Sequence, residues 1–201
     1  MKKQIYLFLI LILFLSACEQ LGFGPGEEEE GLQLPEKIEQ WAIKAKASSS
    51  FAGRYSQAID DQSPYAATGE PDVEQCGDYK YEKYAWAPAH EDKGEEWLEL
   101  EYDDDVFVSD ISIKEISEVG AIIKIELMNK TDYVVIWEGT DTVEDCPGFL
   151  DINLENMTAF KSDTVRITLD TDQDGWNMID AVKLSGYEKR WHVVNETLIW
   201  E

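Results

Sequence analysis

The chain has 201 residues, which is enough for one ordinary domain with a tether and too few for two comfortable domains. Its 42 acidic residues outnumber its 17 Lys and Arg residues, so the formal net charge is −25. Such a chain repels nucleic-acid phosphates and anionic lipid surfaces, which excludes a nucleic-acid-binding protein. It could favour cations, basic partners or neutral ligands, although solubility alone explains the charge.

The N-terminus carries the clearest signal in the chain. Lys2 and Lys3 precede an unbroken apolar run at residues 5–15. This run is typical of a signal peptide, because a membrane-spanning helix needs about 20 apolar residues. The segment Leu15-Ser16-Ala17-Cys18 then resembles the lipobox of bacterial lipoproteins.

The lipobox resemblance implies removal of residues 1–17 and lipid attachment at Cys18, with fatty acyl chains such as palmitate. It places the protein in the cell envelope, anchored to a bacterial membrane on the exported side. More than one acyl chain holds such an anchor stably. The alternative is an ordinary secretory signal, or an uncleaved anchor, with a chance cysteine.

Residues 18–37 read as an acidic tether. Glycines and a proline break regular structure there, and Glu27 to Glu30 repel one another and extend the chain. A calcium site is the alternative interpretation of the glutamate run, but a solvated spacer explains the run without a metal.

Short runs of alternating apolar and polar residues dominate the rest of the chain, with turn residues between several of them. They predict an all-β, antiparallel sandwich. One of them changes phase near Ser109. Single helical turns are expected only at Glu36–Trp41 and Tyr55–Asp61. The predicted strand runs are 96–102, 106–113, 121–128, 133–137, 165–169, 179–184 and 193–200.

The long irregular stretch Ala52–Lys93 is expected to be functional or tied down. It contains Cys76. If Cys18 carries lipid, Cys76 and Cys146 remain as an even pair in an oxidising compartment, which indicates one disulfide. Two free thiols or a metal pair are the alternatives, but His90 and His192 give no zinc-ligand spacing.

Several segments resemble the galactose-binding-like domains of the discoidin and coagulation-factor type C kind, over about residues 38–187. Residues 188–201 would form a C-terminal strand or tail. The segments that carry the resemblance are 45–50, 56–59, 67–73, 85–88, 96–100, 165–170 and 175–186, with Cys76-Gly77-Asp78 and Cys146-Pro147 resembling a disulfide-bearing bacterial branch.

The resemblance implies a jelly-roll β-sandwich with ligand loops at one end. Members bind sugars, lipid head groups or proteins, and many hold a structural calcium. Asp72 and Asp180 are the positions here that best match the calcium ligands. Met178 stands where the pattern often has an acidic residue, so one carboxylate of that site is missing.

Aromatic residues of the irregular stretch are the candidate ligand contacts, because flat rings suit the apolar faces of sugars. We expect ligand contacts from Tyr65, Tyr84, Trp86 and Trp176. Trp97 and Trp137 lie inside strand patterns and are expected in the core. Residues 170–175 match the first half of an EF-hand loop, but strands flank them and position twelve is Ala181.

No catalytic motif is present, since the chain lacks Gly-x-Ser-x-Gly, His-Glu-x-x-His and a glycine-rich phosphate loop. The sequence therefore predicts a non-catalytic binding module on a membrane-anchored lipoprotein, with carbohydrate as the first ligand class. No cofactor is required, although a structural calcium could be held. The alternatives are a structural or assembly lipoprotein that packs against an envelope protein, and a hydrolase without a recognised motif.

Overall fold

The structure is a computed structural model, and it describes residues 35–52, 61–77, 82–91, 93–172, 175–194 and 197–200. The chain divides into two units, Met1–Gln33 and Leu34–Glu201. The predicted signal peptide, Cys18 and the tether up to residue 34 lie outside the described residues. Among the residues that are described, no helix is long and apolar enough to cross a membrane.

In the described residues of the second unit, the regular structure is almost entirely strand, and every pairing between the strands is antiparallel. The 3₁₀ helix η1 (Pro64–Ala67) accompanies them in the part of the chain that the structure describes. The strands are β1 (Ile38–Trp41), β2 (Lys44–Ala47), β3 (Glu95–Ser117), β4 (Ile122–Asn129), β5 (Asp132–Glu138), β6 (Gly148–Asn153), β7 (Lys161–Asp170), β8 (Asn177–Tyr187), β9 (Trp191–Val194) and β10 (Thr197–Trp200).

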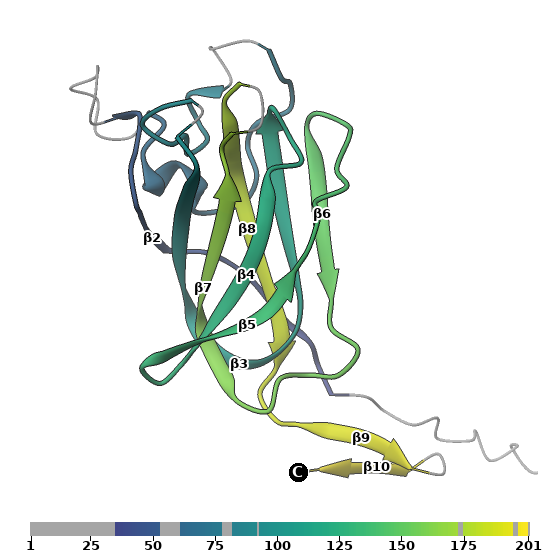
Figure 1. Cartoon of the computed structure of the whole chain (residues 1–201). Coiled ribbons are helices and arrows are strands. Elements are labelled where there is room, and N and C mark those ends of the chain that lie inside the picture. Colours follow the sequence, from purple (N-terminus) through teal and green to yellow (C-terminus); the bar gives the residue numbers. More distant parts are fainter. Residues whose placement is uncertain are drawn as a thin grey trace, which may run out of the picture. The chain divides into compact units, whose positions relative to one another are not determined.

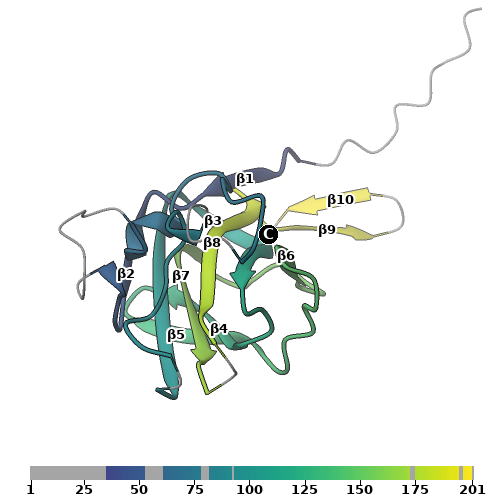
Figure 2. The same cartoon turned by 90° about the horizontal axis from the view of Figure 1, so that it is seen from above.

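The long strand β3 joins the two layers of the sandwich. Its first part, residues 95–101, pairs with β2 and β7, while its later part, residues 107–117, pairs with β8 and β6. One layer is therefore β2-β3-β7-β4-β5 and the other is β1-β8-β3-β6. The register shift between Glu101 and Val106 marks the crossing. Figures 1 and 2 show β3 from two directions.

The core lies between the inner faces of these layers, because alternate residues of a strand point to the same side. In β3, Leu98 and Leu100 are fully buried, while the neighbouring Trp97 faces outward. Burial of each large apolar side chain stabilises the fold by about 1.5–3 kcal/mol. The largest fully buried side chains are Trp86, Leu98, Leu100, Ile111, Ile113, Ile116, Ile122, Ile125, Leu127, Ile167, Leu169 and Ile179.

A second, smaller apolar cluster fastens the irregular segment to the sheet. Val73, Ala85 and Ala87 from that segment pack against Ile116 of β3 and Met178 of β8. Strand β8 is consequently buried along almost its whole length. The irregular segment is therefore tied down, as its length led us to expect.

The predicted all-β sandwich is confirmed, and the phase change near Ser109 is a bulge. Val108 pairs with Gly186 and Asp110 with Ser185, so Ser109 has no partner in the β3–β8 register. The bulge inserts one residue, which moves the alternation by one position and produces the shift seen in the sequence.

Two expectations about local structure differ from the fold. The helical turn predicted at 36–41 is wrong, because these residues include β1, which pairs with β8. The run 193–200 forms part of the β9–β10 hairpin rather than one strand. Most of the turn predicted at 55–61 lies outside the described residues. Strands β2 and β6 were not predicted.

Candidate functional site

The disulfide between Cys76 and Cys146 ties the irregular segment to the loop between β5 and β6. The predicted pairing is confirmed, and it joins positions that are 70 residues apart in sequence. Cross-linking distant positions restricts the unfolded chain most. The disulfide thus holds together two loops at the end of the sandwich that carries the irregular segment (Figure 1).

Tyr65 lies in η1, whose start and end follow from its sequence. Pro64 occupies the first helical position, where its missing N–H costs nothing. The helix ends where Thr68 donates both its backbone N–H and its hydroxyl to the carbonyl of Tyr65, at 3.1 and 2.7 Å. Gly69, at φ +85°, then turns the chain so that its N–H reaches the carbonyl of Ala42. Tyr65 is left 58% exposed.

Tyr84 reaches the same place from the other end of the segment. The backbone N–H of Gln62 donates to the carbonyl of Lys83 at 2.9 Å, so residues 61–62 run beside residues 83–84. Tyr84 is 44% exposed, and the Lys83 ammonium lies 4.6 Å from the centre of its ring.

A cavity of about 230 Å³ lies between these two tyrosines. It is lined by Asp61, Tyr65, Ala66, Thr68, Asp72 and Tyr84. The cavity therefore brings together three residues that were predicted from sequence, Tyr65, Tyr84 and Asp72. Asp61 and Thr68, which were not predicted, also line it. We call this cavity the tyrosine pocket.

Asp72 and Asp180 do come together, but a lysine lies with them. Backbone N–H groups of Asp72 and Val73 donate to the Asp180 carboxylate at 3.4 and 3.2 Å. The Lys114 ammonium contacts Asp180 Oδ2 at 3.0 Å and also donates to the carbonyl of Val73. Lys114 and Asp180 are both buried. The positive charge beside Asp180 is thus already supplied by the protein itself.

The electrostatics of Asp72 reflect this setting. Burial, the negative charge of Asp180 and a hydrogen bond with Asp180 raise the pKa of Asp72 above its usual value. Among the described residues, no group of three or more His, Cys, Asp and Glu side chains is placed to hold a metal ion. Calcium at Asp72 and Asp180 stays a prediction.

Two of the predicted aromatic contacts lie elsewhere. Trp86 is fully buried in the main core, its backbone bridges to Ile179, and its indole N–H donates to the carbonyl of Ser49 at 3.1 Å. It cannot touch a ligand in this fold, so that prediction is wrong. Trp176 is half-buried and packs edge-to-face on Phe51 with ring centres 5.0 Å apart.

The loop between β5 and β6 forms a separate hollow of about 600 Å³. Residues 142–145 and 147–151 line it, and none of them lines the tyrosine pocket. The EF-hand-like run at 170–175 joins β7 to β8, so it lies between strands as expected. In that turn, Asp172 accepts a hydrogen bond from the N–H of Gly94 at 3.0 Å.

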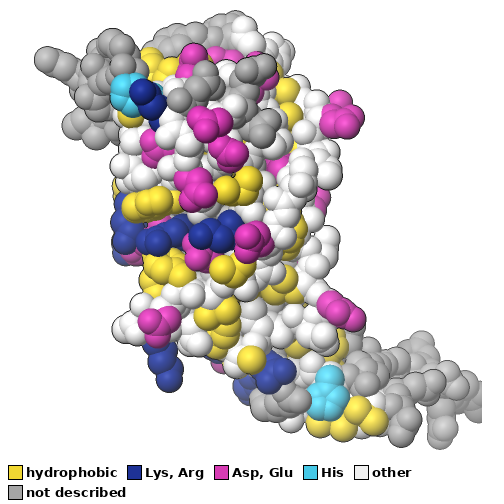
Figure 3. Space-filling model, viewed as in Figure 1, with side chains coloured by type: hydrophobic (Ala, Val, Ile, Leu, Met, Phe, Trp, Pro, Cys, Tyr) yellow, Lys and Arg dark blue, Asp and Glu magenta, His cyan; other side chains and the backbone are white. Residues whose placement is uncertain are grey.

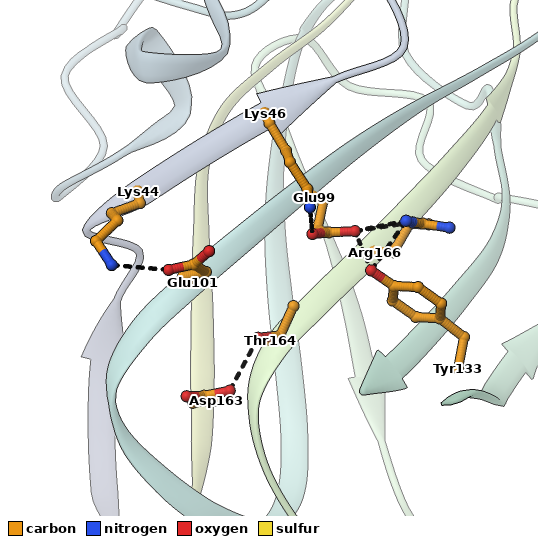
Figure 4. Close-up of polar contacts among 8 residues, drawn as sticks. All are labelled: Lys44, Lys46, Glu99, Glu101, Tyr133, Asp163, Thr164 and Arg166. Atoms are coloured by element: carbon orange, nitrogen blue, oxygen red, sulfur yellow. Dashed lines mark hydrogen bonds and ion pairs between the residues drawn. The ribbon is translucent and has the colours of Figure 1, made fainter. Parts of the chain in front are cut away.

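The outer face of the β2-β3-β7-β4-β5 layer carries an ion network around Glu99. Lys46 and Arg166 contact its carboxylate at 2.5 and 2.6 Å, and the Tyr133 hydroxyl donates to it as well (Figure 4). The Arg166 guanidinium lies over the rings of Trp97 and Tyr133, at 4.6 and 3.7 Å. Trp97 is therefore half-buried on this outer face. The prediction that it lies in the core is wrong.

Burial alone would raise the pKa of the Glu99 carboxyl, but hydrogen bonds from Lys46, Tyr133 and Arg166 outweigh it and hold the pKa below its usual value. Burial and the hydrogen bond to Glu99 raise the pKa of Tyr133 to about 12. Figure 3 shows Lys and Arg side chains in a band with acidic neighbours across the face in view. The paired charges around Glu99 therefore lie on a sheet face where a protein-docking surface would present apolar side chains.

Comparison with protein families decides the classification of the chain. Residues 34–195 match the family model of the C-terminal SD scarf domain of pappalysin-1. The chain belongs to this SD scarf family. The matched part of the SD scarf domain includes η1, the tyrosine pocket, the disulfide and strands β1 to β9. A search of curated proteins found no match.

Solved structures share the SD scarf domain's fold at low sequence identity. A family 32 carbohydrate-binding module of C. perfringens NanJ, solved with galactose, has a TM-score of 0.52 and 14% identity, covering 74% of this chain and 99% of that one. A variant of chitosan-binding module 1 from a Paenibacillus sp. IK-5 chitosanase/glucanase has a TM-score of 0.51 and 17% identity, covering 71% and 93%.

An enzyme shares the fold as well. Allantoicase from Saccharomyces cerevisiae has a TM-score of 0.51 and 13% identity, with 78% of this chain and 46% of that one covered. These likenesses confirm the predicted galactose-binding-like sandwich. They establish the fold alone, since one fold hosts many functions.

Proposed function

We propose that this chain is a non-catalytic carbohydrate-binding module and that the tyrosine pocket is its binding site. The observation that carries the proposal is the convergence of two exposed tyrosines, Tyr65 and Tyr84, with the carboxylates of Asp61 and Asp72 around one cavity. Aromatic faces stack on the apolar faces of sugar rings, and carboxylates accept hydrogen bonds from sugar hydroxyls.

The size and charge of the pocket narrow the ligand class. At about 230 Å³ it is smaller than the 300–1,000 Å³ typical of drug-sized ligand sites, so it suits one sugar unit at the end or side of a chain. Its two carboxylates favour neutral or amino sugars over uronic acids, because a sugar carboxylate would be repelled.

The comparisons support this choice of ligand. Two of the solved structures that share the fold are carbohydrate-binding modules, one solved with galactose and one named for chitosan. Chitosan is a polymer of amino sugars, which is the charge class that the pocket favours. These neighbours are binding modules rather than catalytic domains, which supports binding without catalysis here.

The rival proposal is a structural lipoprotein that packs against an envelope protein through a sheet face. Such a face would present grouped apolar side chains. The outer face around β3 and β7 instead carries the Glu99 network, with Lys46 and Arg166 paired to its carboxylate. This arrangement favours the carbohydrate proposal over the structural one.

We further propose that the domain is displayed on the exported side of a bacterial membrane, held by lipid on Cys18 and lifted by the acidic tether of residues 18–37. The apolar run, the lipobox resemblance and the glutamate run support this proposal. Intact-mass spectrometry of the protein purified from membranes should show a chain that begins at Cys18 with acyl mass added. A free Cys18 thiol would contradict the anchor.

A glycan array probed with the purified protein tests the binding proposal. We expect binding to glycans with terminal galactose or amino-sugar units, and Tyr84→Ala should weaken it about two- to tenfold, since one aromatic contact contributes roughly 0.5–1.5 kcal/mol. Phe149→Ala is the matched control, because Phe149 is 47% exposed and lies outside the pocket. Equal losses in both variants, or no binding by the unaltered protein, would overturn the proposal.

A further inference from the structure

Three buried polar side chains, those of Glu115, Asn177 and Asp141, lie around the turn that follows β3. Glu115 follows Ile113 by two residues on β3, so its side chain points to the inner face that Ile113 helps to form. Asn177 begins β8 opposite Ser117, two positions from the Glu115–Ile179 pair. Asp141 enters from the loop after β5. Their exposed fractions are 2%, 1% and 7%.

Backbone groups hold each of these side chains in place. Oε2 of Glu115 accepts the N–H of Gly120 at 2.9 Å, and the Asn177 amide donates to the carbonyl of Glu118 at 2.8 Å, so both reach the same turn after β3. The Asp141 carboxylate accepts the N–H groups of Ile122 and Val143, at 3.2 and 3.0 Å.

Two oxygen atoms of this cluster have no hydrogen-bond partner among the described residues of the protein. Oε1 of Glu115 and Oδ1 of Asn177 are buried and have no hydrogen-bond donor. A buried acceptor without a partner costs about 1–3 kcal/mol, and more when it is charged. Two such acceptors beside one turn indicate that something absent from the protein chain satisfies them.

The cluster also lacks a positive charge. The carboxyl groups of Glu115 and Asp141 lie close enough to interact with each other. In the described part of the chain, the ion pairs involve neither Glu115 nor Asp141. The contrast with Asp180 is direct, because the Lys114 ammonium already neutralises that carboxylate.

We propose that Glu115, Asp141 and Asn177 bind one calcium ion at the loop end of the sandwich, away from Asp72 and Asp180. Calcium takes six to eight oxygen ligands from carboxylates, amide and backbone carbonyls and water. Glu115 and Asp141 supply two carboxyl groups and Asn177 one amide oxygen, and water would complete the set. The ion would bridge β3, β8 and the loop that carries Cys146. It would thereby fix the turn at residues 118–122 and the loop from residue 141.

Calcium-dependent thermal unfolding of the intact protein tests this site. After treatment with a chelator, added CaCl₂ at a hundred times its Kd should raise Tm by roughly 5–10 °C. Glu115→Gln should abolish this rise. It should also raise Tm of the calcium-free protein, because it removes the repulsion between Glu115 and Asp141, an effect that damage to the fold would not produce. Asp141→Asn serves as the second variant if Glu115→Gln does not fold.

Asp72→Asn is the control that separates the two calcium predictions. It should keep the full response to calcium, because Asp72 lies outside the proposed site. If Asp72→Asn loses the response while Glu115→Gln keeps it, calcium binds beside Asp180 and the proposal is overturned. If calcium leaves Tm of the unaltered protein unchanged, the two carboxyls share a proton instead, and the proposal is equally overturned. Neither result bears on the tyrosine pocket, which the glycan array tests separately.

Discussion

The ammonium of Lys114 on β3 lies 3.0 Å from Oδ2 of Asp180 on β8, and both side chains are buried. Through Asp180 and the carbonyl of Val73, this ion pair fastens the irregular segment to the sheet. It therefore links the position of the tyrosine pocket, which includes Asp72, to the rigid part of the fold.

Removing the lysine should cost much of the stability of the domain. Lys114→Met leaves the Asp180 carboxylate buried without its cation, and breaking such a pair typically costs about 3–5 kcal/mol. Urea unfolding at pH 7 measures the loss. Lys44→Met is the matched control, since Lys44 pairs with Glu101 at 2.8 Å, both side chains are exposed, and the substitution should change stability by about 0–1 kcal/mol. Equal effects of the two substitutions would contradict the account.

Neighbouring aromatic residues should behave in opposite ways. Trp86→Ala empties a core position and should destabilise the fold by about 3–5 kcal/mol. Tyr84→Ala removes an exposed side chain and should change the unfolding free energy by about 0.5 kcal/mol or less. Chemical denaturation of both variants checks this contrast. A mild effect at Trp86 would mean that its side chain is not in the core.

Much of this fold follows from local sequence pattern, and what does not follow depends on contacts between distant residues. The alternation in β3 and β7 predicts their inner faces, and the phase change near Ser109 coincides with the bulge in the β3–β8 register. Strand β1 escapes prediction because four residues carry little intrinsic preference, and pairing with β8 decides their structure.

The site shows the same division between local and distant information. Exposed tyrosines in an irregular segment are a usable signal, and Tyr65 and Tyr84 do meet. The ligand contact predicted for Trp86 fails because its segment bridges to Ile179, and no periodicity in the sequence indicates that bridge. Lys114 gives no signal either, since a lysine within an alternating strand indicates a solvent-facing position. Only the fold brings Asp180 and the Val73 carbonyl to it.

The disulfide should contribute substantially to stability. Replacing Cys76 and Cys146 together by serine frees a loop between positions 70 residues apart, which the chain-entropy model values at about 4 kcal/mol. Thermal unfolding of the double variant, with the oxidised parent as reference, measures the effect. The reduced parent should match the double variant. A reduced parent as stable as the oxidised one would contradict this role.

The Glu99 network should make stability depend on pH in the acid range. The folded state lowers the pKa of Glu99, so its contribution is fully present above the ordinary value of about 4.5 and is lost as the pH falls through the lower, folded-state pKa. The stability difference between the parent and Glu99→Gln, from urea unfolding, should therefore be large at pH 7 and shrink toward pH 3. A difference that does not change with pH would show that Glu99 acts through packing alone.

The most direct test of the binding proposal is a titration of the ¹⁵N-labelled domain with galactose, and separately with chitosan oligosaccharide, followed through backbone amide shifts. The proposal predicts that one of these sugars shifts the amides of Tyr65, Thr68, Asp72 and Tyr84 and leaves those of residues 142–151 unchanged. Shifts confined to residues 142–151, or no saturable shift with either sugar, would contradict it.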